Sequence, residues 1–366
     1  MEIFNDNNHS VYDGKKLRIE VYGASHAQEI GVMVDGFENG DTYSQEELLS
    51  FLSRRRASNQ NFSTTRIEAD LPIVLSGAKD GVLDGKTFKA VVKNQNTKSA
   101  DYGNLVKVPR PSHADYVGWA KYGDGFDYRG GGKFSGRMTV ALCIVGGICK
   151  QLLQKQGITV TAYLQSIGNV NGASYKSYEP YKSGAKIEVK DNSFPLLDDG
   201  VKDKMLLEIE NAKMDCDSVG GKIECVVQGM PIGVGEFMFD SIEGAISRLA
   251  FAVPAVKGIE FGTGFDLTKM LGSAANDQFD VKDGKVFTTT NHNGGINGGI
   301  SNGMDIAFGV AIKPTPSISK KQNSINLETL QREELVIKGR HDTCITVRAV
   351  PVIEAITAIA IYDLIK

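Results

Sequence analysis

Alternating apolar and polar positions predict several short strands along the chain. Residues 17–22 alternate in the way expected of a half-buried strand, and residues 31–36 form its hairpin partner or a following strand. Strand-like runs also occur at 221–227 and 305–311. Residues 1–15 are polar, rich in Asn and poorly patterned, so we treat the segment as a candidate for flexibility.

Two helices are predicted in the first half of the chain. Ser44 and Glu47 have the spacing of a capping box, in which each side chain accepts a hydrogen bond from an otherwise unpaired N–H group. The helix that follows ends at Arg54-Arg55-Arg56. Cations favour a helix C-terminus, but three adjacent like charges exceed what that effect explains. Residues 134–156 predict a long helix that is apolar on every face and therefore buried.

Two further helices are predicted in the second half. Asp240 and Glu243 open a helix that runs to about residue 253, and Pro351 suits the first turn of a C-terminal helix over residues 350–365. Few helices follow strands in regular β-α-β order, so we expect an α+β fold with antiparallel sheets packed around buried helices. No linker or low-complexity segment divides the chain, which favours a single domain over residues 1–366.

Composition excludes several classes of partner. The formal net charge of −3 gives no general attraction to nucleic acid or to an anionic membrane. The five cysteines include no C-x-x-C pair and the N-terminus has no signal-peptide pattern, which predicts a reduced, cytoplasmic protein. The most apolar run, residues 138–149, is shorter than the roughly 20 residues that a membrane span needs.

Histidines and glycines mark the candidate chemistry. The chain has five histidines, and two of them lie in similar segments, Gly23-Ala24-Ser25-His26-Ala27 and Arg110-Pro111-Ser112-His113-Ala114-Asp115. A third segment, Gly339-Arg340-His341-Asp342, sets a cation, an imidazole and a carboxylate side by side. Histidine titrates closest to physiological pH, so these turn-like segments indicate proton transfer. Glycine clusters at 130–132 and 294–303 fit either close approach to a ligand or a loop-rich fold.

Positive charges lie beside turn residues or at element ends, where they favour a multiply charged anion. Lys133 directly follows three glycines at the predicted start of a helix, and Lys313-Pro314-Thr315-Pro316-Ser317 offers a cation and two hydroxyls in a stiff turn. The other such cations are Arg110, Arg129, Arg137, Arg340 and Arg348. No zinc-type spacing, dinucleotide fingerprint, P-loop or G-x-S-x-G elbow occurs, so we expect no metal.

These segments together resemble the chorismate synthase family over nearly the whole chain, and their order and spacing make the resemblance specific. The matching segments are 23–35, the triple arginine, 110–116, 128–137, 217–221, 255–258, 294–303, 313–317 and 339–344, with 348–351 close behind.

The resemblance implies a β-α-β sandwich and a lyase of the shikimate pathway. Such an enzyme eliminates phosphate from 5-enolpyruvylshikimate 3-phosphate in a 1,4-elimination that gives chorismate. The reaction requires reduced FMN without net redox change. The resemblance also implies a homotetramer, a small-molecule substrate, and NADPH or a separate flavin reductase only as a source of reduced flavin.

Residue roles follow from the matching motifs. His26 resembles the acid that protonates the departing phosphate, and His113 the group that sets the protonation of the flavin. Asp342, with Ser25, resembles the group that helps to remove the substrate proton. The positions that match substrate contacts are Arg55, Arg110, Arg129 and Arg137, with Arg55 also matching a nicotinamide contact. Those that match flavin contacts are Lys133, Phe134, Ser135, Pro254, Ala255, Gly298, Lys313, Pro314, Thr315, Pro316, Ser317 and Arg340. His9 and His292 gain no such support.

The chain departs from the family pattern at several of these motifs. Ala24 and Ala27 replace a glutamate and a glycine around His26, and Ser112 replaces the glycine before His113. The remaining departures are Asn61 for an arginine, Phe134 for a small residue and Thr343 for a proline. Two alternatives therefore stay open: a protein of the same fold that binds flavin or a phosphorylated metabolite without turnover, and a flavin reductase that uses nicotinamide.

Overall fold

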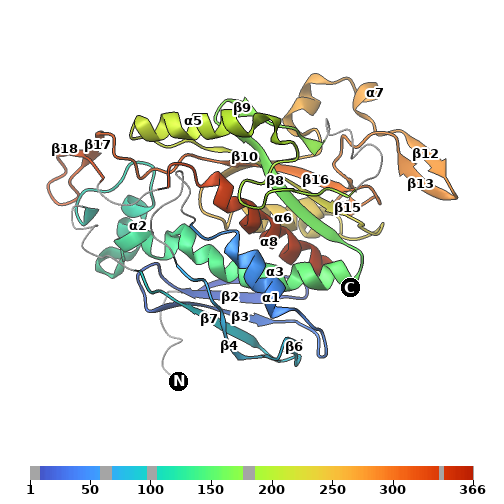
Figure 1. Cartoon of the computed structure of the whole chain (residues 1–366), viewed down its shortest axis with the longest axis horizontal. Helices are drawn as coiled ribbons and strands as arrows, with labels where there is room; N and C mark the ends of the chain where they lie inside the picture. Colours follow the sequence, from blue (N-terminus) through green and yellow to red (C-terminus); the bar gives the residue numbers. More distant parts are fainter. Residues whose placement is uncertain (1–8, 58–67, 97–104, 176–185, 338–341, 366) are drawn as a thin grey trace.

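The computed structural model describes residues 9–57, 68–96, 105–175, 186–337 and 342–365. In these residues two antiparallel sheets enclose a layer of helices, and a further helix, α5 (Lys202–Met214), covers the outside of one sheet (Figure 1). The mixture of helices and antiparallel sheets confirms the predicted α+β class and the sandwich that the resemblance implies.

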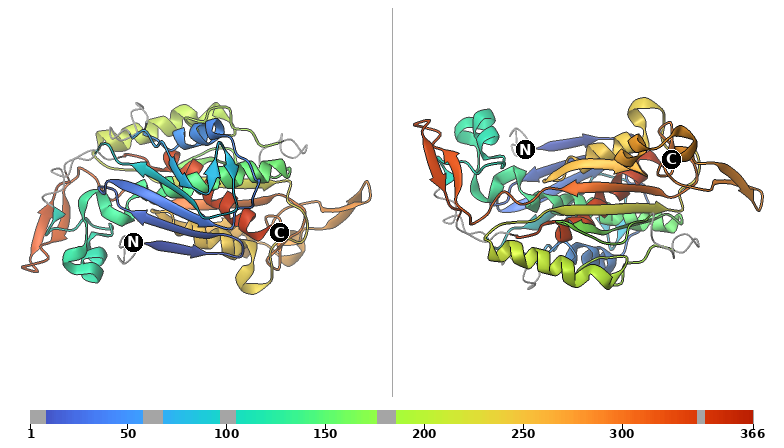
Figure 2. Two further views of the ribbon diagram at one scale, coloured as in Figure 1. Left: turned by 90° about the horizontal axis from the view of Figure 1, so that it is seen from below. Right: turned by 90° about the horizontal axis from the view of Figure 1, so that it is seen from above.

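The first sheet has the strand order β1-β2-β3-β7-β4 and is seen from below in Figure 2. Its central strands β3 and β7 pack side chains against the helices. Ile30, Val32 and Val34 of β3 are fully buried, as are Phe88 and Ala90 of β7. The strands are β1 (Ser10–Asp13), β2 (Arg18–Gly23), β3 (Glu29–Asp35), β4 (Ile73–Ser76) and β7 (Phe88–Lys93).

The second sheet has the order β11-β16-β10-β8-β9, with antiparallel pairing throughout its described strands. Its inner face packs on the helix layer, and α5 lies against β8 on the outer face (Figure 2). The strands are β8 (Thr159–Ile167), β9 (Val170–Asn171), β10 (Gly221–Gln228), β11 (Val256–Phe261) and β16 (Ile306–Ile312).

The helix layer depends on a close approach of α3 to its neighbours. A Cβ atom at Gly146 would lie 2.4 Å from the Cα of Ala355 in α8, and one at Gly147 would lie 2.6 Å from Leu48 in α1. These two glycines therefore let α3 pack closely against a helix on each side. The layer comprises α1 (Gln45–Ser53), α3 (Thr139–Lys155), α6 (Ile242–Ala250) and α8 (Thr346–Leu364).

Smaller elements extend from the sandwich (Figure 1). They are α2 (Asp115–Tyr122), α7 (Gly272–Ala275), the 3₁₀ segments Arg129–Phe134 and Gly136–Met138, and the hairpins β5 (Ala78–Lys79) with β6 (Val82–Leu83), β12 (Phe279–Lys282) with β13 (Lys285–Thr288), β14 (Ile296–Asn297) with β15 (Ile300–Ser301), and β17 (Gln322–Ile325) with β18 (Arg332–Leu335).

The strand predictions at 17–22, 31–36, 221–227 and 305–311 are confirmed, and so is the cap at Ser44, whose Oγ accepts from the backbone N of Glu47 at 3.2 Å. Within the segment treated as a candidate for flexibility, residues 10–13 form a strand that pairs with the edge of β2.

Two helix boundaries were predicted wrongly. Helix α3 starts at Thr139 rather than at residue 134, because the three preceding glycines have positive φ and Ser135 is extended. Helix α8 starts at Thr346, so Pro351 lies inside it rather than in its first turn. Pro351 has no N–H to donate, which costs the helix one backbone hydrogen bond.

The stretch 136–155 is long and apolar enough to cross a membrane by length and composition, contrary to the expectation from residues 138–149. It has a mean hydropathy of 1.3, but 67% of it is buried inside the protein. Most of it is α3, which packs against α1, α8 and β3 and is therefore a core helix.

A buried ion-pair cluster accounts for one arginine of the triple arginine. The two terminal nitrogens of Arg54 donate to the two oxygens of Glu354 at 2.8 and 2.9 Å, and Lys150 donates to the same carboxylate at 2.5 Å. The backbone N of Ala162 adds a bond of 3.0 Å. Burial raises the pKa of Glu354, but the charges of Lys150 and Arg54 outweigh it and lower the pKa to about 2. Glu354 thus joins α1, α3, α8 and β8.

We predict that Glu354→Gln lowers the free energy of unfolding by about 3 kcal/mol, because it leaves two partly buried cations without their carboxylate. Because the pKa of Glu354 is depressed on folding, its contribution is complete above its ordinary pKa and is lost as the pH falls toward 2. Urea unfolding at pH 7 and pH 3 measures both effects. Glu328→Gln, at an exposed pair with Lys107, is the control. Equal stability of the two variants at pH 7 would contradict the prediction.

Candidate active site

The two Ser–His segments meet at one short stretch of backbone. A Cβ atom at Gly130 would lie 2.4 Å from Cε1 of His26 and 2.7 Å from Oγ of Ser25. One at Gly131 would lie 3.3 Å from Nε2 of His113. Gly130 and Gly131 have φ values of 59° and 82°, which favour glycine. The triple glycine is therefore required by its contacts with both histidines.

A carboxylate and an arginine hold His113. Nδ1 of His113 lies 2.6 Å from Oδ1 of Asp115, and Arg110 donates to both oxygens of Asp115, from Nε at 2.7 Å and Nη2 at 2.8 Å. Nη1 of Arg110 donates a hydrogen bond to Oγ of Ser317 at 3.0 Å. Burial is the largest cause that lowers the pKa of His113; Arg110 and Lys313 lower it further, and Asp115 opposes them. The surroundings of His113 thus favour its neutral form.

A surplus of positive charge lies beside this histidine. Lys313 donates from Nζ to the carbonyl of Ser112 at 2.6 Å, and its backbone N donates to Ala255 O at 2.9 Å. Burial first, and the charge of Lys257 second, lower the pKa of Lys313. Ser112 has a φ of 59°, the backbone conformation that glycine adopts readily, so its replacement of the family's glycine is strained.

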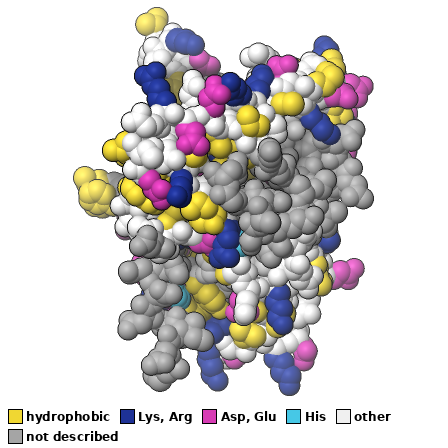
Figure 3. Space-filling view, turned by 90° about the vertical axis from the view of Figure 1, so that its left-hand side faces the viewer, with side chains coloured by type: hydrophobic (Ala, Val, Ile, Leu, Met, Phe, Trp, Pro, Cys, Tyr) yellow, Lys and Arg dark blue, Asp and Glu magenta, His cyan; other side chains and the backbone are white. Residues whose placement is uncertain are grey.

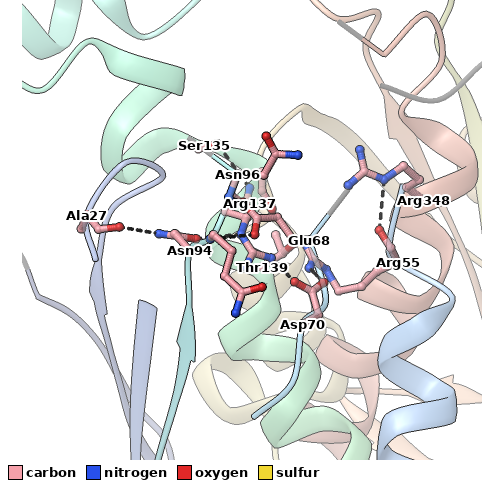
Figure 4. Close-up of polar contacts among 12 residues, drawn as sticks. Ala27, Arg55, Glu68, Asp70, Asn94, Asn96, Ser135, Arg137, Thr139 and Arg348 are labelled. Atoms are coloured by element: carbon pink, nitrogen blue, oxygen red, sulfur yellow. Dashed lines mark hydrogen bonds and ion pairs between the residues drawn. The ribbon is translucent and has the colours of Figure 1, made fainter. Parts of the chain in front are cut away.

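Two buried arginines share one carboxylate. Nη1 of Arg55 and Nη1 of Arg137 each form a short ion pair with Asp70, one with each carboxylate oxygen (Figure 4). Their side chains are 4% and 8% exposed, so neither cation is solvated by water to any extent. Among the described residues, no group accepts a hydrogen bond from Nη2 of Arg137, which is buried. A ligand oxygen would satisfy this donor, which is costly to leave unpaired.

Arg348 connects Asp342 to the pair of Arg55 and Arg137. Nη1 of Arg348 donates to the two oxygens of Asp342 at 3.0 and 2.8 Å, and its Nε donates to the carbonyl of Arg55 at 3.0 Å. The chain of contacts continues to the other side of the site, because Val219 donates from its backbone N to Thr343 O at 2.9 Å, and Ser218 Oγ donates to Thr315 O at 2.7 Å.

These contacts, joined where needed by one or two residues of the chain, close into a circuit, which we call the polar ring. It passes in order through His26, Gly130, Gly131, His113, Asp115, Arg110, Ser317, Thr315, Ser218, Val219, Thr343, Asp342, Arg348, Arg55, Asp70, Arg137 and Asn94, and returns to the turn that carries His26.

The sequence of the chain matches the family model for chorismate synthase over residues 17–365. A chorismate synthase of Lancefieldella parvula is 41% identical over 360 residues, covering 96% of this chain and 94% of its own, and one of Thermococcus kodakarensis is 41% identical over 350 residues, covering 96% of each. The chain belongs to the chorismate synthase family. It is accordingly an enzyme of the lyase class, which is what the name of the family denotes. The crystal structure of a chorismate synthase has the same fold, with a TM-score of 0.70 at 24% identity over 96% of this chain and 92% of that one.

Most residues that match chorismate synthase motifs lie on or beside the polar ring. Phe134 turns toward α2, where its ring centroid lies 6.3 Å from that of Tyr122 and 6.2 Å from that of Phe126, so an aromatic cluster accommodates the large residue. Lys133 lies over the Tyr122 ring at 3.4 Å. Lys133, Phe134 and Ser135 do not open a long helix as predicted. Ser135 instead caps the 3₁₀ segment Gly136–Met138, because its Oγ accepts a hydrogen bond from the backbone N of Arg137 at 3.3 Å.

One predicted residue, Gly298, lies away from the polar ring. Gly298 lies in the β14–β15 hairpin, near the start of β16, whereas Lys313 follows the end of that strand. The seven-residue strand β16, about 20 Å long, lies between Gly298 and Lys313, so these two residues are at opposite ends of the strand within one chain. Arg129 is partly exposed, and its guanidinium pairs with Asp127 at 2.8 Å. Arg340 lies outside the described residues, as does Asn61.

Sequence reasoning gave no role to Asp70, Asn94 or Asp115. Asp115 directly follows the His113 motif, and its proximity to Arg110 was the one available signal. Asp70 and Asn94 belong to no local motif, because their partners come from other elements.

No group of three or more His, Cys, Asp or Glu side chains that could hold a metal ion occurs in the part of the chain that the structure describes. On the face in Figure 3, at the end of the molecule that carries α2 and β17–β18, cationic and acidic side chains are intermixed and histidines show only as small patches.

We predict that Gly130→Ala lowers kcat on the order of a hundredfold, since the new methyl group would displace the His26 ring. Gly157→Ala is the control, because Gly157 has a φ of 81° and nothing lies within 4 Å of an added Cβ. This variant therefore has the strain of an alanine at positive φ but no new side-chain clash. Steady-state kinetics compare the two. Equal losses would show that the contact with His26 does not matter.

We predict that His113 titrates below the ordinary pKa of about 6.5, and lower still in Asp115→Asn, because Asp115 is the group that raises its pKa against Arg110 and Lys313. NMR titration of the imidazole measures both values. Asp127→Asn, which removes a carboxylate paired with Arg129, should leave the His113 titration unchanged. A rise in the pKa of His113 in Asp115→Asn would contradict this account.

Proposed function

We propose that this enzyme eliminates phosphate from 5-enolpyruvylshikimate 3-phosphate in a 1,4-elimination that gives chorismate, in the presence of reduced FMN and without net redox change. The observation that carries the proposal is the polar ring, in which two histidines and a surplus of cations surround one glycine segment. The substrate has a phosphate and two carboxylates, so its site must be strongly cationic in a protein whose net charge is −3.

Local charges support an anionic ligand. Asp70 is shared by Arg55 and Arg137, which leaves one positive charge in excess, and the buried Nη2 of Arg137 has no acceptor among the described residues. Asp115 neutralises the charge of Arg110, and Asp342 neutralises that of Arg348. We assign these two arginines to orienting their partner residues. We therefore assign substrate anion binding to Arg55 and Arg137.

The residues around Lys313 fit the phosphate of FMN. Lys313 and Lys257 add two cations, and Thr315 and Ser317 supply hydroxyl groups in the same turn. Lys133, Ser135, Pro254 and Ala255 would complete that binding region. When bound, reduced FMN supplies electron density to the reacting ring transiently and recovers it.

The chain's own residues provide orientation and protons. His26, half-buried against Gly130, is assigned as the acid that protonates the departing phosphate. His113, whose pKa is lowered chiefly by burial, is assigned to hold the protonation state of the flavin. Asp342 and Ser25 are assigned to the removal of the substrate proton. We also propose that the enzyme is a cytoplasmic homotetramer and that its flavin is reduced by NADPH or by a separate flavin reductase.

We predict that the purified protein releases phosphate from the substrate under anaerobic conditions with reduced FMN. His26→Ala and His113→Ala should each lower kcat by about 10²- to 10⁴-fold, the usual contribution of a general acid or base. Asp342→Ala should also lose activity. His292→Ala, which removes a bond to Thr263 away from the ring, should retain it.

Other outcomes of this assay identify the alternatives. Tight binding of FMN without phosphate release would indicate a binding protein of the same fold. Oxidation of NADPH with FMN and no phosphate release would indicate a flavin reductase. Full activity of both histidine variants would overturn the assigned roles while leaving the reaction in place.

A further inference from the structure

Asn94 joins the turn of His26 to the arginine pair (Figure 4). It directly follows β7, and its backbone N donates to Gln28 O at 2.9 Å. Its side-chain Nδ2 donates to the carbonyls of Ala27 at 2.8 Å and Ala24 at 3.1 Å, and its Oδ1 accepts from Nε of Arg137 at 3.1 Å.

The partners of this amide fix its orientation. The carbonyls of Ala24 and Ala27 only accept hydrogen bonds, whereas the guanidinium of Arg137 only donates them. The NH₂ group must therefore face the turn and the oxygen must face Arg137. Neither an aspartate, which lacks the donors, nor an alanine can make both sets of contacts.

The turn that Asn94 holds is the one that places His26. Ala27 donates from its backbone N to Ala24 O at 3.2 Å, so residues 24–27 form a single turn whose two end carbonyls both bind Asn94. On its other side, the turn is held by the bond from Ser25 N to Gly132 O at 3.1 Å. The position of the imidazole thus depends on Asn94 from one side and on the triple glycine from the other.

Asn94 also sets the direction of Arg137. Its oxygen holds Nε and Asp70 holds Nη1, which leaves the buried Nη2 as the nitrogen without an acceptor among the described residues. A planar guanidinium that is fixed at two nitrogens has a fixed third one. The direction in which Nη2 points is therefore a consequence of these two contacts.

We propose that Asn94 is a positioning residue that fixes His26 and the anion-binding nitrogen of Arg137 relative to one another. The inference rests on the proposed function, in which His26 protonates the departing phosphate and Arg137 binds the same anionic substrate. Catalysis by oriented groups is sensitive to displacements of about 1 Å, which can cost on the order of a hundredfold in rate. One amide spanning both groups removes such displacements.

The first test measures the effect of releasing these contacts on kinetics. Asn94→Ala should lower kcat by about 10- to 100-fold and raise KM, because it releases both the turn and Arg137. Asn94→Asp repels the two carbonyls, so it should lower kcat, and its charge cancels the excess positive charge of the arginine pair, so it should also raise KM. Asn291→Ala is the matched control. The amide of Asn291 also binds a carbonyl and holds a glycine-rich loop, through Asp305 O at 2.9 Å and Gly295 N at 2.6 Å, but away from the ring.

A double-mutant cycle shows whether Asn94 acts through His26. In a His26→Ala background, Asn94→Asp should cause little further loss of kcat, since the group that it positions is gone. If the losses of kcat in the two single variants multiply in the double variant, the proposal is overturned. It is also overturned if both Asn94 variants have the same kinetics as Asn291→Ala.

A chemical readout makes the test independent of turnover. Carbethoxylation by diethyl pyrocarbonate, followed peptide by peptide with mass spectrometry, should modify His26 severalfold faster in the Asn94 variants, with His113 as the internal reference. Failure of the unmodified enzyme to release phosphate would overturn the proposed function, and this readout would still decide the positioning of His26. An unchanged His26 rate in a variant that retains its thermal unfolding midpoint would overturn the role of Asn94.

Discussion

The sharing of Asp70 by two buried arginines is the interaction on which the site depends. Taking two guanidinium groups out of water side by side is unfavourable unless a carboxylate lies between them and their other donors find partners. Asp70 provides the carboxylate, and Asn94 and Thr139 accept from remaining nitrogens. Asp70 has a positive φ of 50°, so the chain accepts local backbone strain at the residue that neutralises the pair.

The sandwich brings this pair to the histidines because the contributing segments end at the same place. The turn of His26 joins β2 to β3, and Asn94 follows β7, which pairs with β3. The triple glycine precedes α3, Lys313 follows β16 and Asp342 precedes α8. Rigid strands and helices thus supply fixed ends, and the reactive side chains lie on short connections between them.

The buried helix layer makes those ends rigid. Helix α8 is buried along its length and carries two carboxylates that bind other elements: Glu354 holds Arg54 and Lys150, and Asp363 accepts from the backbone N of Lys16 at 2.8 Å and of Leu17 at 2.7 Å. The charge repulsion expected of the triple arginine is avoided because Arg54 and Arg55 pair with different carboxylates. The same helix end therefore stabilises the core through one arginine and the site through the next.

The sequence by itself determined the class of fold, most strands, the chemistry of the site and the family, because apolar periodicity and short motifs are local properties. It placed His26, His113 and the triple glycine in the same list of motifs without showing that they touch. It misplaced the start of α3, since the three glycines before it have positive φ, two of them packed against the histidines and the third against Asp127. Only the tertiary structure identified Asp70, Asn94 and Asp115, and separated Gly298 from Lys313. An ion pair or an amide bridge between distant segments is a matter of distance in space, which no local pattern in the chain encodes.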